Sequence, residues 1–342
     1  MFYHISEENK ELYIHVDLIN YFVKITSPCE DIYDRKSPNV KIEKGSISFF
    51  FLDCIYRIFL DTSIVTIKDK RTLKERIVKC NKITSDKYMQ MSQIIDRYSL
   101  LIESAVYAPY SKTIKFVYRV DKSKIEGMQE YFPIIKELSN TGITSFEKMK
   151  QLLFWLSDNI KHNGQMMLPH KKDAISLYKF AKKNGSTLNC RGLAIILCEL
   201  CLALNLKARY IVCSQKELKY SDSHVVTICY SKIFKKWVYL DPCYKMYLIG
   251  EDQTILSLQE LKEYIVKKKN ILINQEANYW GNTLEFNVYR EKMIKKLYKF
   301  ASPKHIYFGM DNDREDNLIY LVPDESFYPT LNCTSDYKAF WK

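Results

Sequence analysis

Glycine and proline are scarce in this sequence, with nine of each among 342 residues. Flexible linkers and low-complexity segments are rich in these residues, so the composition excludes a chain dominated by such segments. Apolar residues make up 47% of the chain and aromatic residues 14%, which excludes a mostly disordered protein. We therefore expect a folded, aromatic-rich protein that is long enough for two domains.

The sequence also lacks a long uncharged apolar run. Its longest apolar stretch, residues 47–60, contains Asp53 and Arg57 and is shorter than the roughly 20 residues that a membrane-spanning helix needs. A buried strand or a pair of strands is the better interpretation. The first twenty residues mix charged and apolar side chains, so we expect no signal peptide and no membrane span.

The ten cysteines are dispersed and do not reach the density of a disulfide scaffold. A reducing cytoplasm is the simplest compartment for such a chain. Cys198 and Cys201 have the spacing of a metal or redox pair, but they lie in an apolar helical pattern without a second pair, which favours core packing. Because the sequence also contains no phosphate-binding loop or paired-carboxylate site, we expect neither a metal nor a cofactor.

The net charge of +12 comes mainly from lysine, which far outnumbers arginine. A basic surface can attract nucleic acid, anionic lipid or an acidic peptide. However, the lysines are scattered and do not alternate with aromatic residues, and arginine is the better reader of bases. We interpret the charge as a solvated lysine-rich surface and expect no nucleic-acid partner.

The chain has two parts that differ in their pattern of apolar residues. Up to about residue 120 the sequence favours strands, in runs dense in Ile, Val, Tyr and Phe: residues 12–26, 39–60, 64–68 and 113–120. Within this half, apolar residues at three- and four-residue steps predict one helix over residues 86–105. No enzyme motif occurs in this half, so we assign no role to a β-rich N-terminal domain over residues 1–125.

The rest of the chain favours helices followed by strands. Helical patterns cover residues 147–160, 173–183 and 189–204, and strand patterns cover residues 208–214, 224–231 and 236–241. A helix packed on an antiparallel sheet is an α+β fold. We expect this domain to cover residues 126–300, with a C-terminal extension over residues 301–342. The lysine-rich residues 289–300 are predicted to form a helix at the surface or packed at an edge, and Trp155 and Trp237 to pack in the core.

Cys190 stands where a polar loop passes into an apolar helix. Free N–H groups and the positive dipole end at a helix N-terminus lower the pKa of a thiol, which activates it as a nucleophile. Asn189 is a good helix-capping residue, and Arg191 adds positive charge beside the sulfur. The small residues Gly192 and Ala194 allow another element to pack closely against this helix.

His224 and Asp241 supply the groups that a thiol nucleophile needs. His224 opens a strand-like run after a polar loop, and Asp241 ends the next predicted strand, so a short turn would place the two side chains together. The carboxylate would then fix the imidazole and stabilise its protonated form. Considered alone, each residue has an ordinary interpretation: a cysteine in core packing, a histidine at a loop–strand junction and an aspartate in a turn.

Together, these segments resemble the transglutaminase-like superfamily, and the particular sequence is similar to such proteins of low-GC Gram-positive bacteria. The resemblance extends over residues 146–265 and rests on four short strings: Asn189–Ala194, Leu204–Tyr210, His224–Val226 and the W-x-x-L-D-P string Trp237–Pro242. Residues 161–164 and 256–261 also take part. Cys243 departs from the family, in which threonine usually follows Asp-Pro, and its thiol leaves redox sensitivity open.

The resemblance implies a papain-type fold with a Cys–His–Asp triad: Cys190 as nucleophile, His224 as general base and then acid, and Asp241 as orienting carboxylate. The oxyanion would meet the Cys190 backbone N–H and one further donor, for which the candidates are Asn184, Asn189, His162 and Asn163. The reaction would pass through a thioester acyl-enzyme on a peptide or protein amide.

Three functions remain open at this point. The first is a cysteine hydrolase or peptidase, in which water resolves the acyl-enzyme. The second is a protein-glutamine acyl transferase, in which an amine does so and cross-links proteins. The third is a non-catalytic binding module on the same fold.

Overall fold

The computed structural model describes the backbone of residues 101–342, apart from residues 103, 110–112, 217–222, 295 and 329–330, and of nine strands within residues 2–82. Side chains are described from residue 101 onward, apart from the residues just named and residues 313, 315 and 316. The chain divides into two compact units, Met1–Asp96 with Glu217–Tyr220 and Arg97–Lys216 with Ser221–Lys342. This division lies before the boundary that we expected at residue 125, and the domain assignment stays a prediction.

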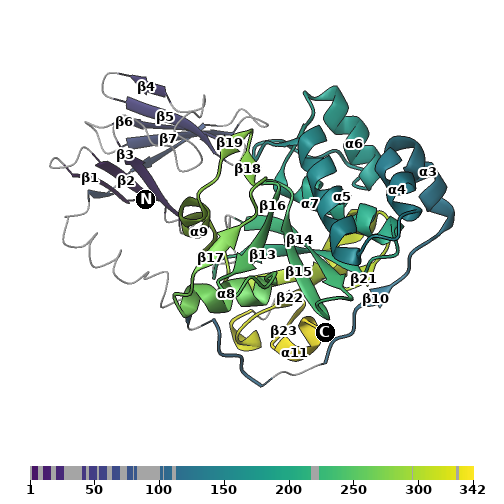
Figure 1. Cartoon of the computed structure of the whole chain (residues 1–342). Coiled ribbons are helices and arrows are strands. Elements are labelled where there is room, and N and C mark those ends of the chain that lie inside the picture. Colours follow the sequence, from purple (N-terminus) through teal and green to yellow (C-terminus); the bar gives the residue numbers. More distant parts are fainter. Residues whose placement is uncertain are drawn as a thin grey trace. The chain divides into compact units, whose positions relative to one another are not determined.

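The first unit contains two sheets (Figure 1). One sheet has the order β3-β2-β1-β9, from β1 (Phe2–Ser6), β2 (Glu11–Val16), β3 (Tyr21–Thr26) and β9 (Asn81–Lys82). The other has the order β4-β5-β6-β7-β8, from β4 (Lys41–Glu43), β5 (Ser46–Phe51), β6 (Cys54–Phe59), β7 (Ile64–Asp69) and β8 (Glu75–Lys79). The longest apolar stretch therefore forms a pair of antiparallel strands, β5 and β6, as predicted. The helix expected over residues 86–105 lies mostly outside the described residues.

The second unit is built on an eight-stranded sheet with the order β17-β16-β15-β14-β13-β20-β22-β23. Its strands are β13 (Ala208–Ser214), β14 (Ser223–Ser231), β15 (Lys236–Asp241), β16 (Met246–Gly250), β17 (Ile271–Ile273), β20 (Lys299–Pro303), β22 (Leu318–Leu321) and β23 (Cys333–Thr334). Neighbouring strands are antiparallel except β22 and β23. The α+β class that we predicted is confirmed, with the strands β13–β15 within one residue of the expected positions.

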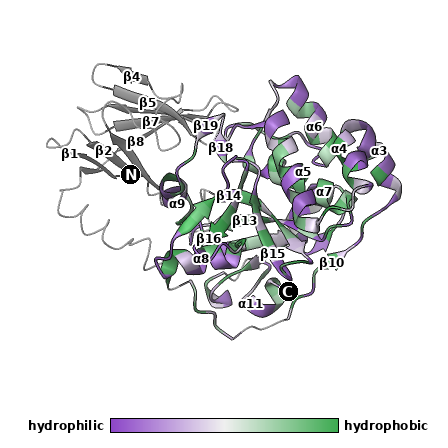
Figure 2. Cartoon of the chain, viewed as in Figure 1, coloured by the Kyte–Doolittle hydropathy of each residue, from purple (hydrophilic) through white to green (hydrophobic). Residues whose placement is uncertain are grey.

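The N-terminal part of this unit is helical, and its helices lie beside one another (Figure 1). They are α3 (Ser123–Tyr131), α4 (Pro133–Ser139), α5 (Ser145–Asn159), α6 (Ala174–Lys183) and α7 (Cys190–Ala203). Every residue of α7 from Gly192 onward is buried, because α7 packs on β13 and β14 while α5 and α6 cover its other sides. Figure 2 shows the difference between the core and the outer helices: hydrophobic colours lie on β13 and β14, and hydrophilic stretches lie on α3. Cys198 and Cys201 are fully buried in this core, as predicted.

The other elements of the second unit are short. They are β10 (Val117–Tyr118), β11 (Lys161–His162), β12 (Thr187–Leu188), α8 (Leu258–Val266), β18 (Asn278–Tyr279), β19 (Asn282–Thr283), α9 (Phe286–Ile294), β21 (His305–Ile306), a 3-10 turn at Met310–Asp313, α10 (Arg314–Asn317), a 3-10 turn at Glu325–Phe327 and α11 (Tyr337–Phe340). Two expectations were wrong. The strand over residues 113–120 shrinks to β10, and the helix over residues 289–300 ends at Ile294, because the residues from Lys299 onward pair with β13. None of the helices in the described ranges has the length and apolar character of a membrane span.

Residues 301–342 are built into the core of the second unit. The fully buried Arg209 donates a hydrogen bond to the carbonyl oxygen of Phe340, and its guanidinium carbon lies 3.8 Å from the centre of the Phe116 ring. The indole N–H of Trp237 donates to the carbonyl oxygen of Trp341 at 2.9 Å. These contacts attach α11 and the residue after it to β13 and β15.

A buried carboxylate connects α7 to two distant segments. Glu199 is 1% exposed, and its two oxygens accept hydrogen bonds from the backbone N–H groups of Ala174, at 2.9 Å, and Gly309, at 2.8 Å. Burial raises the pKa of Glu199 to about 8, although these two hydrogen bonds oppose the effect. The contacts hold the start of α6 and the turn before α10 against the helix that begins at Cys190.

Candidate active site

Cys190 is the first residue of α7 and is held there by its neighbours. The side-chain oxygen of Asn189 accepts a hydrogen bond from the Gly192 N–H at 3.0 Å, as expected of a helix cap, and its amide donates to the Met166 carbonyl at 2.8 Å. A Cβ atom added at Gly192 would lie 2.9 Å from a methyl group of Leu168 and 3.3 Å from the Leu188 side chain, so a larger residue would force these side chains to shift. As a residue, Cys190 is partly exposed, whereas the helix is buried from Gly192 onward.

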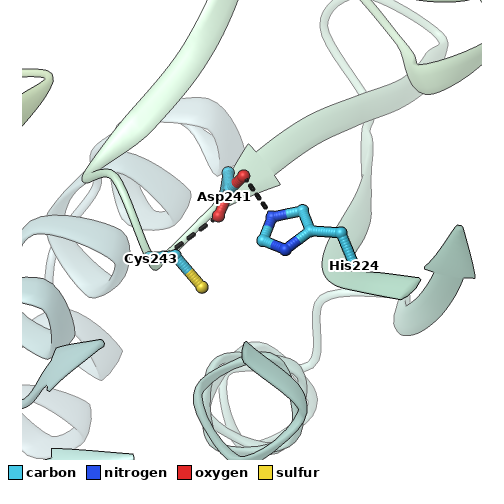
Figure 3. A group of neighbouring side chains, drawn as sticks. All are labelled: His224, Asp241 and Cys243. Carbon is cyan, nitrogen blue, oxygen red and sulfur yellow. Dashed lines mark hydrogen bonds and ion pairs between the residues drawn. The ribbon is translucent and has the colours of Figure 1, made fainter. Parts of the chain in front are cut away.

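His224 and Asp241 meet across two neighbouring strands. Strands β14 and β15 are antiparallel, and the Nε2 atom of His224 lies 2.7 Å from the Oδ2 atom of Asp241 (Figure 3). Asp241 is fully buried, and His224 is 7% exposed. Since Nε2 is engaged with the carboxylate, Nδ1 is the ring nitrogen that can bond to the thiol of Cys190.

The thiol of Cys190 has two histidine partners. Burial raises its pKa, but hydrogen bonds from His162 and His224, together with electrostatic interactions with these rings, outweigh burial and lower the pKa to about 5. Burial lowers the pKa of His224, but the charge and hydrogen bond of Asp241, followed by those of Cys190, raise it to about 10. Both shifts favour the thiolate of Cys190 together with the imidazolium of His224.

His162 reaches the thiol through a short parallel strand pair. Strand β11 pairs with β12, with His162 opposite Leu188, two residues before Cys190. The Nδ1 atom of His162 lies 3.3 Å from the hydroxyl oxygen of Tyr279. This contact leaves the other ring nitrogen of His162 for the thiol.

A group of donors surrounds the Asp241 carboxylate. Its Oδ2 atom accepts hydrogen bonds from the hydroxyls of Tyr289, at 2.7 Å, and Tyr239, at 3.3 Å, and its Oδ1 atom accepts one from the backbone N–H of Cys243, at 3.0 Å. Burial raises the pKa of Asp241, but the charge and hydrogen bond of His224, followed by the hydrogen bonds from Tyr289 and the Cys243 N–H, outweigh burial and lower it. Tyr289, which we expected in a helix at the surface or packed at an edge, is 1% exposed, so its side chain is not at the surface.

The loop after Asp241 is fixed by α5. The hydroxyl of Ser157 donates to the carbonyl oxygen of Pro242 at 2.9 Å. Cys243, the residue that departs from the family pattern, is buried, and its thiol lies beside the carboxylate of Asp241. Burial raises the pKa of this thiol, and the negative charge of Asp241 raises it further.

His224, Asp241 and Cys243 could also be considered as metal ligands, because their ligand atoms lie within 4.8 Å of one another (Figure 3). The carboxylate, however, already accepts four hydrogen bonds, and one of them joins it directly to the imidazole at 2.7 Å. A metal would have to displace these bonds in a fully buried site. The donor geometry therefore fits an oriented histidine better than a metal centre.

The four candidates for the second oxyanion donor lie in different surroundings. Asn184 caps the end of α6, where its amide donates to the Phe180 carbonyl at 2.8 Å, and the amide of Asn189 is engaged as described. The side-chain oxygen of Asn163 accepts a hydrogen bond from the Gln165 N–H at 3.1 Å. His162 alone of the four is a hydrogen-bond partner of the Cys190 thiol.

The charge of Arg191 is compensated. Its guanidinium forms an ion pair with the buried carboxylate of Asp311, which also accepts a hydrogen bond from the Tyr210 hydroxyl at 2.6 Å. Arg191 thus connects the start of α7 to the C-terminal part of the chain.

The residues that sequence reasoning missed are the tyrosines. Tyr239 lies two positions before Asp241 in the same strand, so the two-residue period of a strand places both on one face and could have identified it. Tyr289 is 48 residues from Asp241 in the sequence, and no local signal connects the two. His162 was named only as an oxyanion candidate, whereas it bonds to the thiol itself.

Comparison with known proteins identifies the segment that carries these residues. Two solved structures resemble the chain: a candidate cysteine protease from Cytophaga hutchinsonii, with 14% identity over 48% of this chain and 56% of that one and a TM-score of 0.27, and a candidate protease from Parabacteroides distasonis, with 9% identity over 47% and 30% and a TM-score of 0.26. The chain thus spans about half the length of the first protein and about a third of the length of the second. No curated protein matches the sequence. The family model of the transglutaminase-like superfamily matches residues 134–242. This segment, with Cys190, His224 and Asp241 inside it, is similar to the transglutaminase-like superfamily.

Proposed function

We propose that the protein is a cysteine hydrolase that cleaves a peptide or protein amide, with Cys190 as nucleophile, His224 as acid and base, and Asp241 as orienting carboxylate. The observation that carries the proposal is the thiol of Cys190 at a helix N-terminus with two histidine partners, one of which is bonded to a buried carboxylate. A cysteine that serves only to pack a core has no such partners; Cys198, for example, has a raised pKa in the same helix.

The protonation state supports a simple reaction sequence. The Cys190 thiolate attacks the amide carbon, and the oxyanion that forms is met by the Cys190 backbone N–H at the start of α7. The His224 imidazolium then gives its proton to the leaving amine, which leaves a thioester. Water attacks the thioester while His224 takes up its proton, and the acid is released with the thiolate restored. Asp241 stays ionised throughout and holds the ring through Nε2.

Labelling and product analysis test this proposal. An amide-based thiol-reactive probe should label Cys190, and the label should disappear in Cys190→Ala. Cys333→Ala is a matched control, since Cys333 is also partly exposed but lies on β23. Folding of each variant is checked by circular dichroism. Loss of the label in the control, or its persistence in Cys190→Ala, would contradict the assignment of the nucleophile.

Mass spectrometry of the products then separates the reaction types. With a peptide substrate in water, hydrolysis adds the mass of water across the amide. If an added primary amine appears in the product instead, the enzyme is an acyl transferase. A folded protein that is labelled by no probe and forms no product would leave only the binding module.

A further inference from the structure

A tight hairpin beside the candidate active site carries a tryptophan in an unfavourable backbone conformation. Strands β18 and β19 are joined by Trp280 and Gly281, whose φ angles of 57° and 81° are both positive. Such two-residue hairpin turns favour Asn-Gly, and a bulky residue with positive φ is a genuine outlier. Outliers of this kind persist where a function or the surrounding structure requires the side chain.

The side chain of Trp280 is exposed but fixed. It is 52% exposed, so it gains little from core burial. Its indole N–H donates a hydrogen bond to the carbonyl oxygen of His162 at 2.8 Å. The side-chain oxygen of Asn278 accepts a hydrogen bond from the Gly281 N–H at 2.9 Å. The hairpin therefore presents a large aromatic surface to solvent in one orientation.

This surface belongs to the surroundings of the Cys190 thiol. Trp280 binds the backbone of His162, and the ring of His162 is a hydrogen-bond partner of Cys190. From the same hairpin, Tyr279 contacts the His162 ring, with 5.9 Å between ring centres, and Tyr244, at 5.2 Å. The ring of Tyr244 in turn lies 6.1 Å from that of His224. Aromatic rings thus run from the hairpin to the second histidine partner of the thiol.

We infer that Trp280 forms a subsite for a large apolar or aromatic side chain of the polypeptide whose amide Cys190 attacks. The inference rests on the proposed function and names its substrate class. Because the indole N–H is engaged with His162, the ring offers apolar contact rather than hydrogen bonds. The turn residues carry no charge that would select a charged side chain, and the residues that flank them, Tyr279 and Asn282, are also uncharged.

A series of tripeptidyl vinyl sulfones tests the subsite. Each compound carries alanine at every position except one, where phenylalanine is placed in turn, and the readout is the rate of Cys190 labelling relative to the all-alanine compound. This ratio cancels any change in the reactivity of the thiol. The wild-type protein should prefer phenylalanine at one position by about tenfold, the order expected of one aromatic contact.

Three variants separate the tryptophan ring from its structural role. Trp280→Asn introduces the favoured Asn-Gly turn, so the variant should fold with equal or greater thermal stability. It should lose the preference for phenylalanine. Trp280→Phe keeps an aromatic ring and should retain most of it. Phe327→Ala removes another exposed aromatic, 65% exposed, and should retain all of it. A preference that survives in Trp280→Asn, or none in the wild-type protein, overturns the subsite. If iodoacetamide fails to label Cys190 in the wild-type protein, the proposed function itself fails.

Discussion

The thiol of Cys190 should titrate far below an ordinary cysteine. Its pKa is lowered from 9.0 to about 5 by the histidine partners, against the effect of burial. At pH 6 a thiol with a pKa of 5 is about 90% ionised and one with a pKa of 9.0 about 0.1%, a ratio of roughly 900 in the nucleophilic form.

A less basic thiolate is also a weaker nucleophile. With a Brønsted coefficient of about 0.4–0.5, a pKa difference of about 4 costs roughly 60-fold in intrinsic rate. The net gain over an ordinary thiol is then about 15-fold at pH 6 and less than about twofold at pH 7. Absolute reactivity at neutral pH is therefore a poor test, and the pH profile is a good one.

The assay is the second-order rate of reaction with a dipyridyl disulfide between pH 4 and pH 10. The rate measured for Cys190→Ser is subtracted at each pH, which removes the other cysteines. The difference should rise through pH 5 and stay level from about pH 6 to pH 9, because the thiolate is fully formed there. As pH rises through about 10, His224 loses its proton and no longer supplies the positive charge.

Histidine variants identify the cause of the shift. His162→Ala and His224→Ala should each move the midpoint to higher pH, whereas His170→Ala, at an exposed loop position, should leave it in place. A wild-type rate that increases tenfold per pH unit up to pH 8 would refute the reasoning, because Cys190 would then be an ordinary thiol.

Three further substitutions test the support of the site. Tyr289→Phe removes a buried hydrogen bond to the Asp241 carboxylate, so it should cost about 1.5–3 kcal/mol in urea unfolding and raise the pKa of Asp241; an unchanged midpoint would contradict this role. Asn189→Ala removes the cap of α7 and should cost about 1–2 kcal/mol in thermal unfolding, with slower labelling of Cys190. Glu199→Ala leaves two backbone N–H groups without their acceptor and should cost about 2–4 kcal/mol, while Glu251→Ala, at an exposed turn, is the control and should cost under about 1 kcal/mol.

How far the sequence predicts the molecule depends on the range of the interactions. Helix α7 was predicted to within one residue, because its apolar period and the cap at Asn189 are local signals. The contact of His224 with Asp241 followed from two adjacent strands joined by a short turn. Tyr289 and the pairing of β20 with β13 were not predictable in this way, since they depend on segments that meet only in the folded chain.

The position of β20 limits how the transglutaminase-like segment can be used. Residues 134–242 contain only β13, β14 and β15 of the large sheet. In the whole chain, β13 pairs with β20 and β15 pairs with β16, and both of these partner strands come later in the sequence. A fragment cut at the limits of the family match would expose the backbone N–H and C=O groups of two strand edges, which promotes association between copies. Recombinant fragments intended to remain monomeric should therefore extend at least through β23.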